Sequence, residues 1–328
     1  MRHASTSPEA ILAPHHSVAA EYDALHTANG TLVGDDQMWI SVIIPSVDRR
    51  EVLHETVLSL ARQLRQADEI LLSVNDPERD VAPETLSLPG VRLVTGPRGL
   101  TCQRNTALDR VHPKCNLITF FDDDVELDPL YLRICCQFMS QHPGVVGMSG
   151  CMRADGSVTG EVSRGEAKLV IEKSPEAEDS FEPRCGLPGG DMTIRKSIAQ
   201  QIRFDTRLAF YGLYEDFDFG ARCARLGRLV RVQRCQLVHL ATRTSRVSGK
   251  RFGYAQVMNS HYLWRKGSMN VQCHLHTVAI SLIGNLVGML VFRGGVSRPQ
   301  RIERFRGNML GFRDVIVYGA QPERIENI

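Results

Sequence analysis

The chain has 328 residues, 43% hydrophobic and 23% charged, a length and composition typical of one large globular domain with an appendage, or of two domains. Its formal net charge of only +2 argues against nucleic acid as a partner. Nine cysteines occur without a Cys-x-x-Cys pair, and no basic region followed by an apolar run opens the chain. We therefore expect a cytoplasmic protein with reduced thiols and no secretory signal.

Residues 1–38 are polar and lack periodicity, so we expect an N-terminal extension without chemistry of its own. Residues 39–45 predict a buried strand that ends at a proline. Helical spacing follows over 51–67, and a second strand over 68–77 ends in polar residues. A strand, a helix and a strand in this order predict a β-α-β unit with parallel strands.

The next stretch leads to a run of three consecutive carboxylates. A third short strand is predicted over 91–94, and a helix over 101–111 with Thr101 as its N-cap. The apolar run 117–121 then predicts a buried strand that ends at the triplet Asp122–Asp124. Adjacent carboxylates repel one another, which favours a bound divalent metal. The alternative is an acidic turn that caps the next helix.

Beyond the triplet, helices and strands continue to alternate. We predict a helix over 130–141, a strand over 145–152, an irregular segment over 155–183, a glycine-rich turn over 186–191, a strand over 192–195, a helix that ends near Gly227, and strands over 228–232 and 237–240. No internal repeat interrupts this order.

The C-terminal region differs in composition. Residues 253–266 predict a helix, and residues 278–292 form an apolar stretch of fifteen residues without a charge. A membrane span needs about 20 residues, so a buried or interfacial helix is favoured. The segment from Arg293 to Arg313 contains six arginines, both ends included, and a single acid, Glu303. This basic run fits either contact with an anionic membrane surface or a solvated basic face on a packing helix.

Three acidic points follow predicted strands or lie in adjoining loops: Asp76, the triplet, and the pair Glu215-Asp216. In a parallel sheet the strand ends share one edge, so these groups can converge. The triplet suits a metal, and the pair suits general-base work. His239 ends another predicted strand and is either a further metal ligand or a satisfied core residue.

Basic and amide side chains lie just upstream of the triplet. Arg98, Arg104 and Asn105 either bind a phosphate or are ordinary polar residues at a helix start. The sequence has no Gly-x-Gly-x-x-Gly segment and no Walker-type loop. A nucleotide would therefore bind through strand-end carboxylates and a metal.

Five segments, in this order, resemble the family 2 glycosyltransferases with the GT-A fold: Ser41–Pro45, Gly99–Asn105, Phe121–Val125, Gly189–Met192 and Tyr214–Arg222. The resemblance extends from about Trp39 to His239. It implies an α/β fold of the GT-A (Rossmann-like) type, with a mixed sheet flanked by helices and a helical C-terminal appendage. We therefore expect an N-terminal extension over 1–38 and a glycosyltransferase domain over 39–244. From its composition, we expect residues 245–328 to form a helical region that either contacts a membrane or packs as a soluble appendage.

The resemblance also implies an inverting, metal-dependent hexosyl transfer from a nucleotide-sugar donor to an acceptor hydroxyl. The basic run beside the apolar stretch suggests a glycan or lipid-linked acceptor, as in polysaccharide or glycoconjugate biosynthesis, at the inner face of the cell membrane. The metal would be Mn²⁺ or Mg²⁺. By analogy Asp124 binds the metal with Asp122 and His239; Asp123 lies near the ribose, Asp76 and Pro45 near the nucleobase, and Asp216, or less favourably Glu215, is the base. The sequence departs from the family pattern at Asn75-Asp76-Pro77 and at Val47-Asp48-Arg49.

Two alternatives stay open at this point. A phosphatase of the haloacid dehalogenase type also has an Asp-x-Asp element after an apolar strand, but it needs Thr or Val where this chain has Glu126. The other alternative is a glycosyltransferase-like domain that only binds sugar nucleotide or glycan. The intact triplet and the intact Glu215-Asp216 pair disfavour it.

Overall fold

The computed structural model of the chain describes residues 38–175, 179–242, 248–290 and 296–328. The expected N-terminal extension lies, apart from Met38, outside these described residues. The strands are β1 Ile40–Pro45, β2 Glu69–Val74, β3 Val91–Thr95, β4 Leu117–Phe121, β5 Val125–Leu127, β6 Val145–Asp155, β7 Phe181–Arg184, β8 Asp191–Arg195 and β9 Arg228–His239. The helices are α1 Arg50–Ala61, α2 Pro77–Asp80, α3 Leu100–Leu108, α4 Tyr131–Gln141, α5 Gly156–Thr159, α6 Arg164–Glu172, α7 Lys196–Ile202, α8 Glu215–Cys223, α9 Gly249–Lys266, α10 Val271–Leu290 and α11 Arg298–Tyr318, with 3-10 turns η3 Pro83–Ser87 and η4 Pro322–Asn327.

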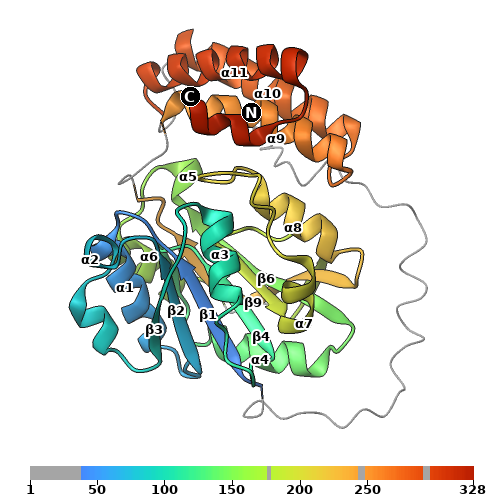
Figure 1. Ribbon diagram of the computed structural model, residues 1–328. Helices are drawn as coiled ribbons and strands as arrows, with labels where there is room; N and C mark the ends of the chain where they lie inside the picture. The colour runs from blue at the N-terminus through green and yellow to red at the C-terminus, as the bar shows by residue number, and fades with distance from the viewer. Residues whose placement is uncertain (1–37, 176–178, 243–247, 291–295) are drawn as a thin grey trace.

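The strands form one mixed sheet in the order β3-β2-β1-β4-β8-β6-β9-β5, and β7 pairs with β9. β3, β2, β1 and β4 run parallel, which confirms the predicted β-α-β unit. β8 lies antiparallel between β4 and β6, whereas β6 and β9 are parallel. The carboxyl ends of β1, β2 and β4 therefore share one edge, which faces the C-terminal helices in Figure 1.

Apolar side chains cover both faces of the sheet, because successive strand residues point to opposite sides. Val42 and Ile44 of β1 pack with Leu53 and Val57 of α1 on one face, where α4 also contributes. Ile43 packs on the other face, with residues of α3, α7 and α8. β1, β2 and β4 are buried along their whole length, which explains their near-continuous apolar sequences.

The prediction of an irregular segment over 155–183 is wrong. This segment contains α5 and α6, and the Ser163 hydroxyl and the Glu166 carboxylate form a capping box at the start of α6. A capping box satisfies two otherwise unpaired backbone amides, so a helix begins here despite the mixed charges. Ala167 and Ile171 of α6 pack against the end of β9, which supplies the burial that periodicity alone did not reveal.

Two other predictions need correction. The strands expected over 228–232 and 237–240 are one strand, β9, of 12 residues, because it pairs with β5, β6 and β7 along its length. Thr101 is not the N-cap of α3. Gly99 holds that position, and the Thr101 hydroxyl instead donates to the Leu208 carbonyl at 3.2 Å.

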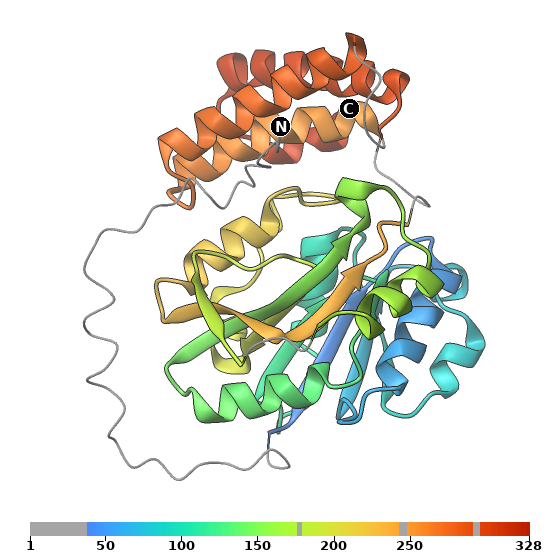
Figure 2. The same cartoon turned by 180° about the vertical axis from the view of Figure 1, so that it is seen from behind.

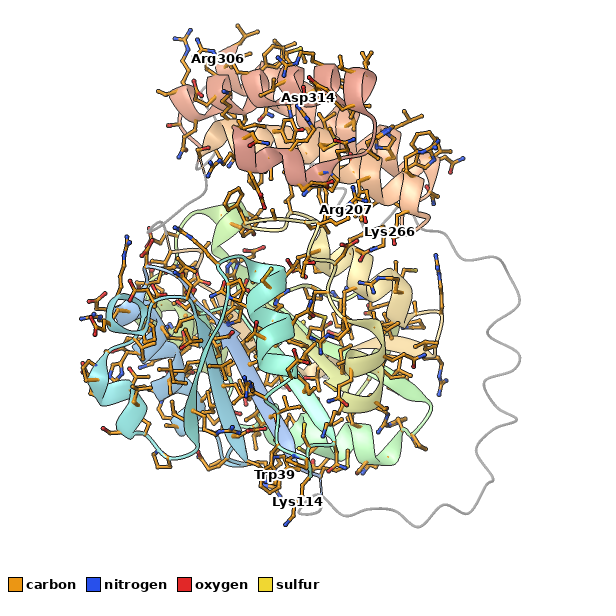
Figure 3. All side chains as sticks on the ribbon, in the orientation of Figure 1. Trp39, Lys114, Arg207, Lys266, Arg306 and Asp314 are labelled. Carbon is orange, nitrogen blue, oxygen red and sulfur yellow. The ribbon has the colours of Figure 1, made fainter. Side chains whose placement is uncertain are left out.

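Helices α9, α10 and α11 form a layer beyond the carboxyl edge of the sheet, as Figures 1 and 2 show from opposite sides. Lys266 of α9 pairs with Asp218 of α8 at 2.8 Å, and Arg207 pairs with Glu323 of η4 at 3.0 Å. Figure 3 labels Arg207 and Lys266 at this junction. The layer is thus attached to the helix that begins with Glu215 and Asp216.

Close backbone contact joins α9 to α11. A Cβ atom on Gly253 would lie 1.9 Å from the Arg304 carbonyl oxygen, and one on Gly307 would lie 2.0 Å from the Lys250 carbonyl oxygen. No side chain fits at either position, so the two helices can meet at this distance only through glycine.

Helix α10 is held to its neighbours by buried amides. The Asn285 side chain is 1% exposed and donates to Asn308 at 2.8 Å and to Gln256 at 3.0 Å. Of the described helices, α10 is the one long and apolar enough to cross a membrane by length and composition, with a mean hydropathy of 1.5.

We expect Gly253→Ala to lower the free energy of unfolding by about 2 kcal/mol, because the added methyl group must push α9 and α11 apart. Gly284→Ala is the matched control, since its Cβ would meet no atom within 4 Å. Alanine favours a helix over glycine by up to about 1 kcal/mol, so the control should be neutral or stabilising. Urea unfolding measures both, and equal losses would contradict the close packing.

Candidate active site

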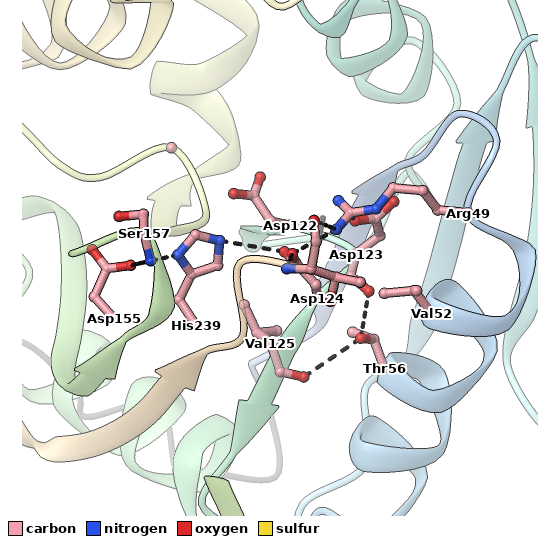
Figure 4. Close-up of polar contacts among 12 residues, drawn as sticks. Arg49, Val52, Thr56, Asp122, Asp123, Asp124, Val125, Asp155, Ser157 and His239 are labelled. Carbon is pink, nitrogen blue, oxygen red and sulfur yellow. Dashed lines mark hydrogen bonds and ion pairs between the residues drawn. The ribbon is translucent and has the colours of Figure 1, made fainter. Parts of the chain in front are cut away.

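The acidic triplet lies in the loop between β4 and β5, at the carboxyl edge of the sheet. Asp123 and Asp124 are buried, whereas the side chain of Asp122 keeps 36% of its surface. The Thr56 hydroxyl of α1 donates to the backbone carbonyl of Asp123 at 2.6 Å and fixes the loop (Figure 4). The three carboxylates therefore differ in how open they are to a ligand.

Arg49 bridges the two buried carboxylates. Its Nη1 atom lies 2.5 Å from Asp123 Oδ1 and its Nη2 atom 2.6 Å from Asp124 Oδ2, as Figure 4 shows. Burial raises the pKa of Asp123 to about 7, whereas hydrogen bonds from His239 and Arg49 outweigh burial at Asp124 and hold its pKa below its usual range. Arg49 thus supplies a fixed cation to the triplet.

His239 lies beside the triplet because of strand pairing. In the register of β9, His239 is opposite Val125 of β5 and Asp155 of β6. Its Nδ1 atom lies 2.8 Å from Asp155 Oδ1, and its Nε2 atom 3.4 Å from Asp124 Oδ1 (Figure 4). Burial disfavours the charged ring, but hydrogen bonds with Asp124 and Asp155 outweigh it and raise the pKa of His239 to about 10.

One possible ligand atom from each of Asp122, Asp124 and His239 lies within 4.8 Å of the other two. No second cluster of this kind occurs within the described ranges. The structure therefore brings together the residues that were predicted as metal ligands.

A glycine-rich turn separates the triplet from the acidic pair of α8. The Gly189 amide donates to Asp216 Oδ2 at 3.0 Å. A Cβ atom on Gly190 would lie 2.5 Å from Asp122 Oδ2, and one on Gly189 would lie 2.9 Å from Glu215 Oε1. The two glycines thus let the turn pass between carboxylates from both sides, which brings Asp122 and Asp216 near one another.

The two acids of the pair have different surroundings. Glu215 is buried and forms an ion pair with Arg104, and burial raises its pKa to about 8 against the opposing charge of Arg104. Asp216 is half-buried and accepts hydrogen bonds from the Gly189 and Phe217 amides. Asp216 is therefore oriented and still accessible, whereas Glu215 is enclosed.

Two of the predicted phosphate-binding residues, Arg104 and Asn105, are bound within the protein itself, whereas Arg98 is exposed and lies 3.6 Å from Asp48. The Arg104 side chain is fully buried and, besides Glu215, donates to the Gly189 carbonyl at 2.7 Å. The Asn105 side chain binds the backbone of Phe204 through both its oxygen and its nitrogen. These contacts give both residues a positioning role for the loops around the acidic pair.

The residues predicted near a nucleobase lie at the ends of β1 and β2. Pro45 ends β1 in register with Ser73 of β2. Asp76 is exposed and caps α2 through the Arg79 amide. The buried Asp80 carboxylate accepts from the Asp48 amide at 2.7 Å and the Asp76 amide at 3.1 Å, which ties the two loops together.

Sequence reasoning missed Arg49 and Asp155. Arg49 follows β1 at the same edge as the triplet, and this position was the one available signal. Asp155 lies at the end of β6, which runs beyond the predicted 145–152. Only the pairing with β9 places it beside His239.

A mixed sheet with antiparallel β8 next to β4, and acids gathered at the carboxyl edge, defines the GT-A class of fold. A structure of GalNAc-T7 with UDP, GalNAc and Mn²⁺ shares it, with a TM-score of 0.51, 13% identity, and coverage of 88% of this chain and 59% of that chain. S. aureus TarS 1–349 also matches, with a TM-score of 0.49, 16% identity, and coverage of 88% and 83%. The sequence matches no curated protein.

Residues 41–202 match the family model of glycosyl transferase family 2, and this part of the chain belongs to the family. It is a glycosyltransferase of the GT-A fold. The predicted fold class and family are confirmed, and the phosphatase alternative is excluded because that enzyme belongs to a different family.

Asp191, at the start of β8, is a buried carboxyl near the site whose raised pKa should make stability depend on pH. It is 1% exposed and binds the Tyr131 hydroxyl and the Gly150 amide. Burial raises the pKa of Asp191 to about 6. Because the folded pKa exceeds the unfolded one, the wild type should lose stability as pH rises from about 4 to 6, by up to roughly 3 kcal/mol. Asp191→Asn should lack this loss, and parallel pH profiles in urea unfolding would contradict the assignment.

Arg49→Gln should lower the free energy of unfolding by about 3 kcal/mol in the presence of EDTA, because it leaves the buried Asp123 without its cation and Asp124 with His239 alone. Arg79→Gln is the matched control. Its side chain is 65% exposed where it pairs with Asp48, so its loss should cost less than about 1 kcal/mol. Similar costs for both variants would show that Arg49 does not hold the triplet.

Proposed function

We propose that this glycosyltransferase is metal-dependent and inverting, and moves a hexosyl group from a nucleotide-sugar donor to an acceptor hydroxyl. The observation that carries the proposal is the cluster of Asp122, Asp124 and His239 on one side of the Gly189–Gly190 turn, with Asp216 on the other. In a single-displacement reaction, a metal site stabilises the leaving diphosphate while a base activates the acceptor hydroxyl, and these two proposed groups lie on either side of one turn here.

The donor set fits a divalent cation. Asp124 Oδ1 and His239 Nε2 face one another, Asp122 is partly exposed, and Asp155 orients the imidazole through Nδ1. Carboxylate oxygens suit Mg²⁺ and Mn²⁺ alike, and the imidazole favours Mn²⁺. When bound, the cation would offset negative charge on the departing diphosphate. GalNAc-T7, which has the same fold, is described with UDP and Mn²⁺.

We assign the donor to the edge formed by β1, β2 and β4. Asp123 would lie near the ribose, and Pro45 and the exposed Asp76 near the nucleobase. Arg104 and Asn105 are assigned to positioning, because their side chains are occupied by Glu215, Gly189 and Phe204. The donor site therefore depends on carboxylates and a cation, with no phosphate loop.

Asp216 is the proposed base. Its carboxylate is held by two backbone amides and remains accessible. It would accept the proton of the acceptor hydroxyl while that oxygen forms a bond to the anomeric carbon and the bond to the diphosphate breaks on the opposite face. Glu215 is less suited, because Arg104 binds it inside the protein; its role is to hold the turn.

The wider proposals follow from this reaction. Residues 39–244 would form the catalytic domain and 245–328 a helical region attached to α8. We call the side of the proposed base Asp216, where α8 meets this region through Asp218 and Lys266, the acceptor side. The acceptor would be a glycan or a lipid-linked sugar, as in polysaccharide or glycoconjugate biosynthesis, and the protein would act in the cytoplasm at the inner face of the cell membrane.

Thermal shift with a panel of nucleoside diphosphates and their sugars, with and without Mn²⁺, tests the donor site. A ligand that binds only the folded state raises the melting temperature. We expect one nucleotide to do so only with Mn²⁺. Asp124→Asn and His239→Gln should abolish this shift, and Glu84→Gln, an exposed carboxylate on η3, should keep it.

The same panel separates catalysis from binding. Asp216→Asn should keep the Mn²⁺-dependent shift but lower the rate of sugar-nucleotide consumption by about 10²-fold or more, because it removes only the base. A shift without consumption by the wild type would favour the non-catalytic binding domain. A shift that is independent of metal would contradict the proposed cluster.

A further inference from the structure

Helix α10 exposes a continuous apolar face. Six large side chains on it keep 46% to 77% of their surface: Leu275, Ile280, Ile283, Leu286, Val287 and Leu290. Their spacing of mostly three or four residues puts them on one side of the helix. α10 contains no Asp, Glu, Lys or Arg. Contiguous apolar surface of this kind marks an interaction site.

The opposite side of α10 is committed to the helical layer. Asn285 is bound to Asn308 and Gln256, and Ser281 and His274 are 9% exposed. A helix crossing a bilayer would have to leave these partners, and the Asn285 amide would lose its hydrogen bonds in hydrocarbon. The partner of the apolar face must therefore approach from one side only.

Positive charge outweighs negative charge beside this face, where Glu303 is the single acid among the arginines of α11 from Arg298 to Arg306 and pairs with Arg306 at 2.7 Å. From Gly267 to Ile302 the sequence has no Asp or Glu. Arg301 lies against Gly288 of α10, because a Cβ atom on Gly288 would lie 2.9 Å from Arg301 Nε. Arg298 and Arg306 are exposed on α11, and Figure 3 labels Arg306 on the outer side of the layer. An apolar face beside arginines is complementary to anionic lipid.

The chain offers two other occupants. A second copy seated on the same face would bring these arginines against the same acid-free stretch, so it would supply no opposite charge. Residues 1–37 carry five acids and could reach across in the same molecule. Charge therefore disfavours a second copy of the chain as the occupant. Vesicle binding by the full chain distinguishes a membrane surface from residues 1–37.

We propose that α10 lies in the plane of an anionic membrane surface, with its apolar side chains among the acyl chains and Arg298, Arg301 and Arg306 at the headgroups. The helical layer would then hold the acceptor side of the enzyme against lipid. That this delivers a lipid-linked acceptor rests on the proposed function, whereas the surface binding itself does not.

The test is sedimentation of the full chain with phosphatidylcholine vesicles, with and without phosphatidylglycerol. Ile280→Ser/Ile283→Ser/Val287→Ser should lower the partition coefficient by about tenfold or more, since three exposed apolar contacts are lost. The matched control changes three exposed leucines within residues 39–244 to serine: Leu86, Leu93 and Leu226, each 38% to 42% exposed. This control should bind vesicles as the wild type does.

Arg298→Gln/Arg306→Gln should weaken binding to the anionic vesicles but not to the neutral ones, and added salt should do the same. If the serine variant fails to fold by its melting curve, this pair still decides the question. The proposal is overturned if the wild type does not bind, if neither variant changes binding, if light scattering shows a dimer that the serine variant abolishes, or if binding requires removal of residues 1–37. Binding needs no donor or metal, so Asp216→Asn should bind normally.

Discussion

Neutralisation of carboxylates at one edge of the sheet is the constraint on which the site depends. Loops from separate parts of the chain bring acids together there, and arginines pair with the buried acids of the triplet and of the Glu215-Asp216 pair. Arg49 serves Asp123 and Asp124, and Arg104 serves Glu215. A buried charge without such a partner costs several kcal/mol, so these loops can converge only in this arrangement.

This pairing separates two kinds of carboxylate. Glu215 is enclosed by Arg104 and holds the turn in place, whereas Asp124 binds Arg49 through Oδ2 and faces His239 with Oδ1. Asp122 and Asp216 are more open, and both lie against the glycine-rich turn. The chemistry of a transferase needs groups of the second kind, supported by groups of the first. The enclosed Arg104–Glu215 pair is therefore as important to the site as the accessible acids.

A buried acid with cationic partners also attaches the helical layer to α8. Asp218 is fully buried in α8 and binds Arg222 of its own helix, Lys266 at the end of α9 and Ser268 just after it. Since α8 begins with Glu215 and Asp216, the proposed base and the layer belong to one connected unit. A surface that binds the outer helix α10 would thereby be linked to the acceptor side of the site.

The sequence by itself determined the parallel strands β1, β2 and β4, the acidic strand end and the family, because these features lie in short contiguous segments with clear periodicity. It also named Asp122, Asp124 and His239 as ligands by resemblance. Only the tertiary structure decided how these residues are held. Arg49, Asp155 and Arg104 act through partners far along the chain, at distances set by strand register and by glycine contacts. Such pairings leave no local pattern, since ion pairs and burial arise only when the sheet and the layer have packed.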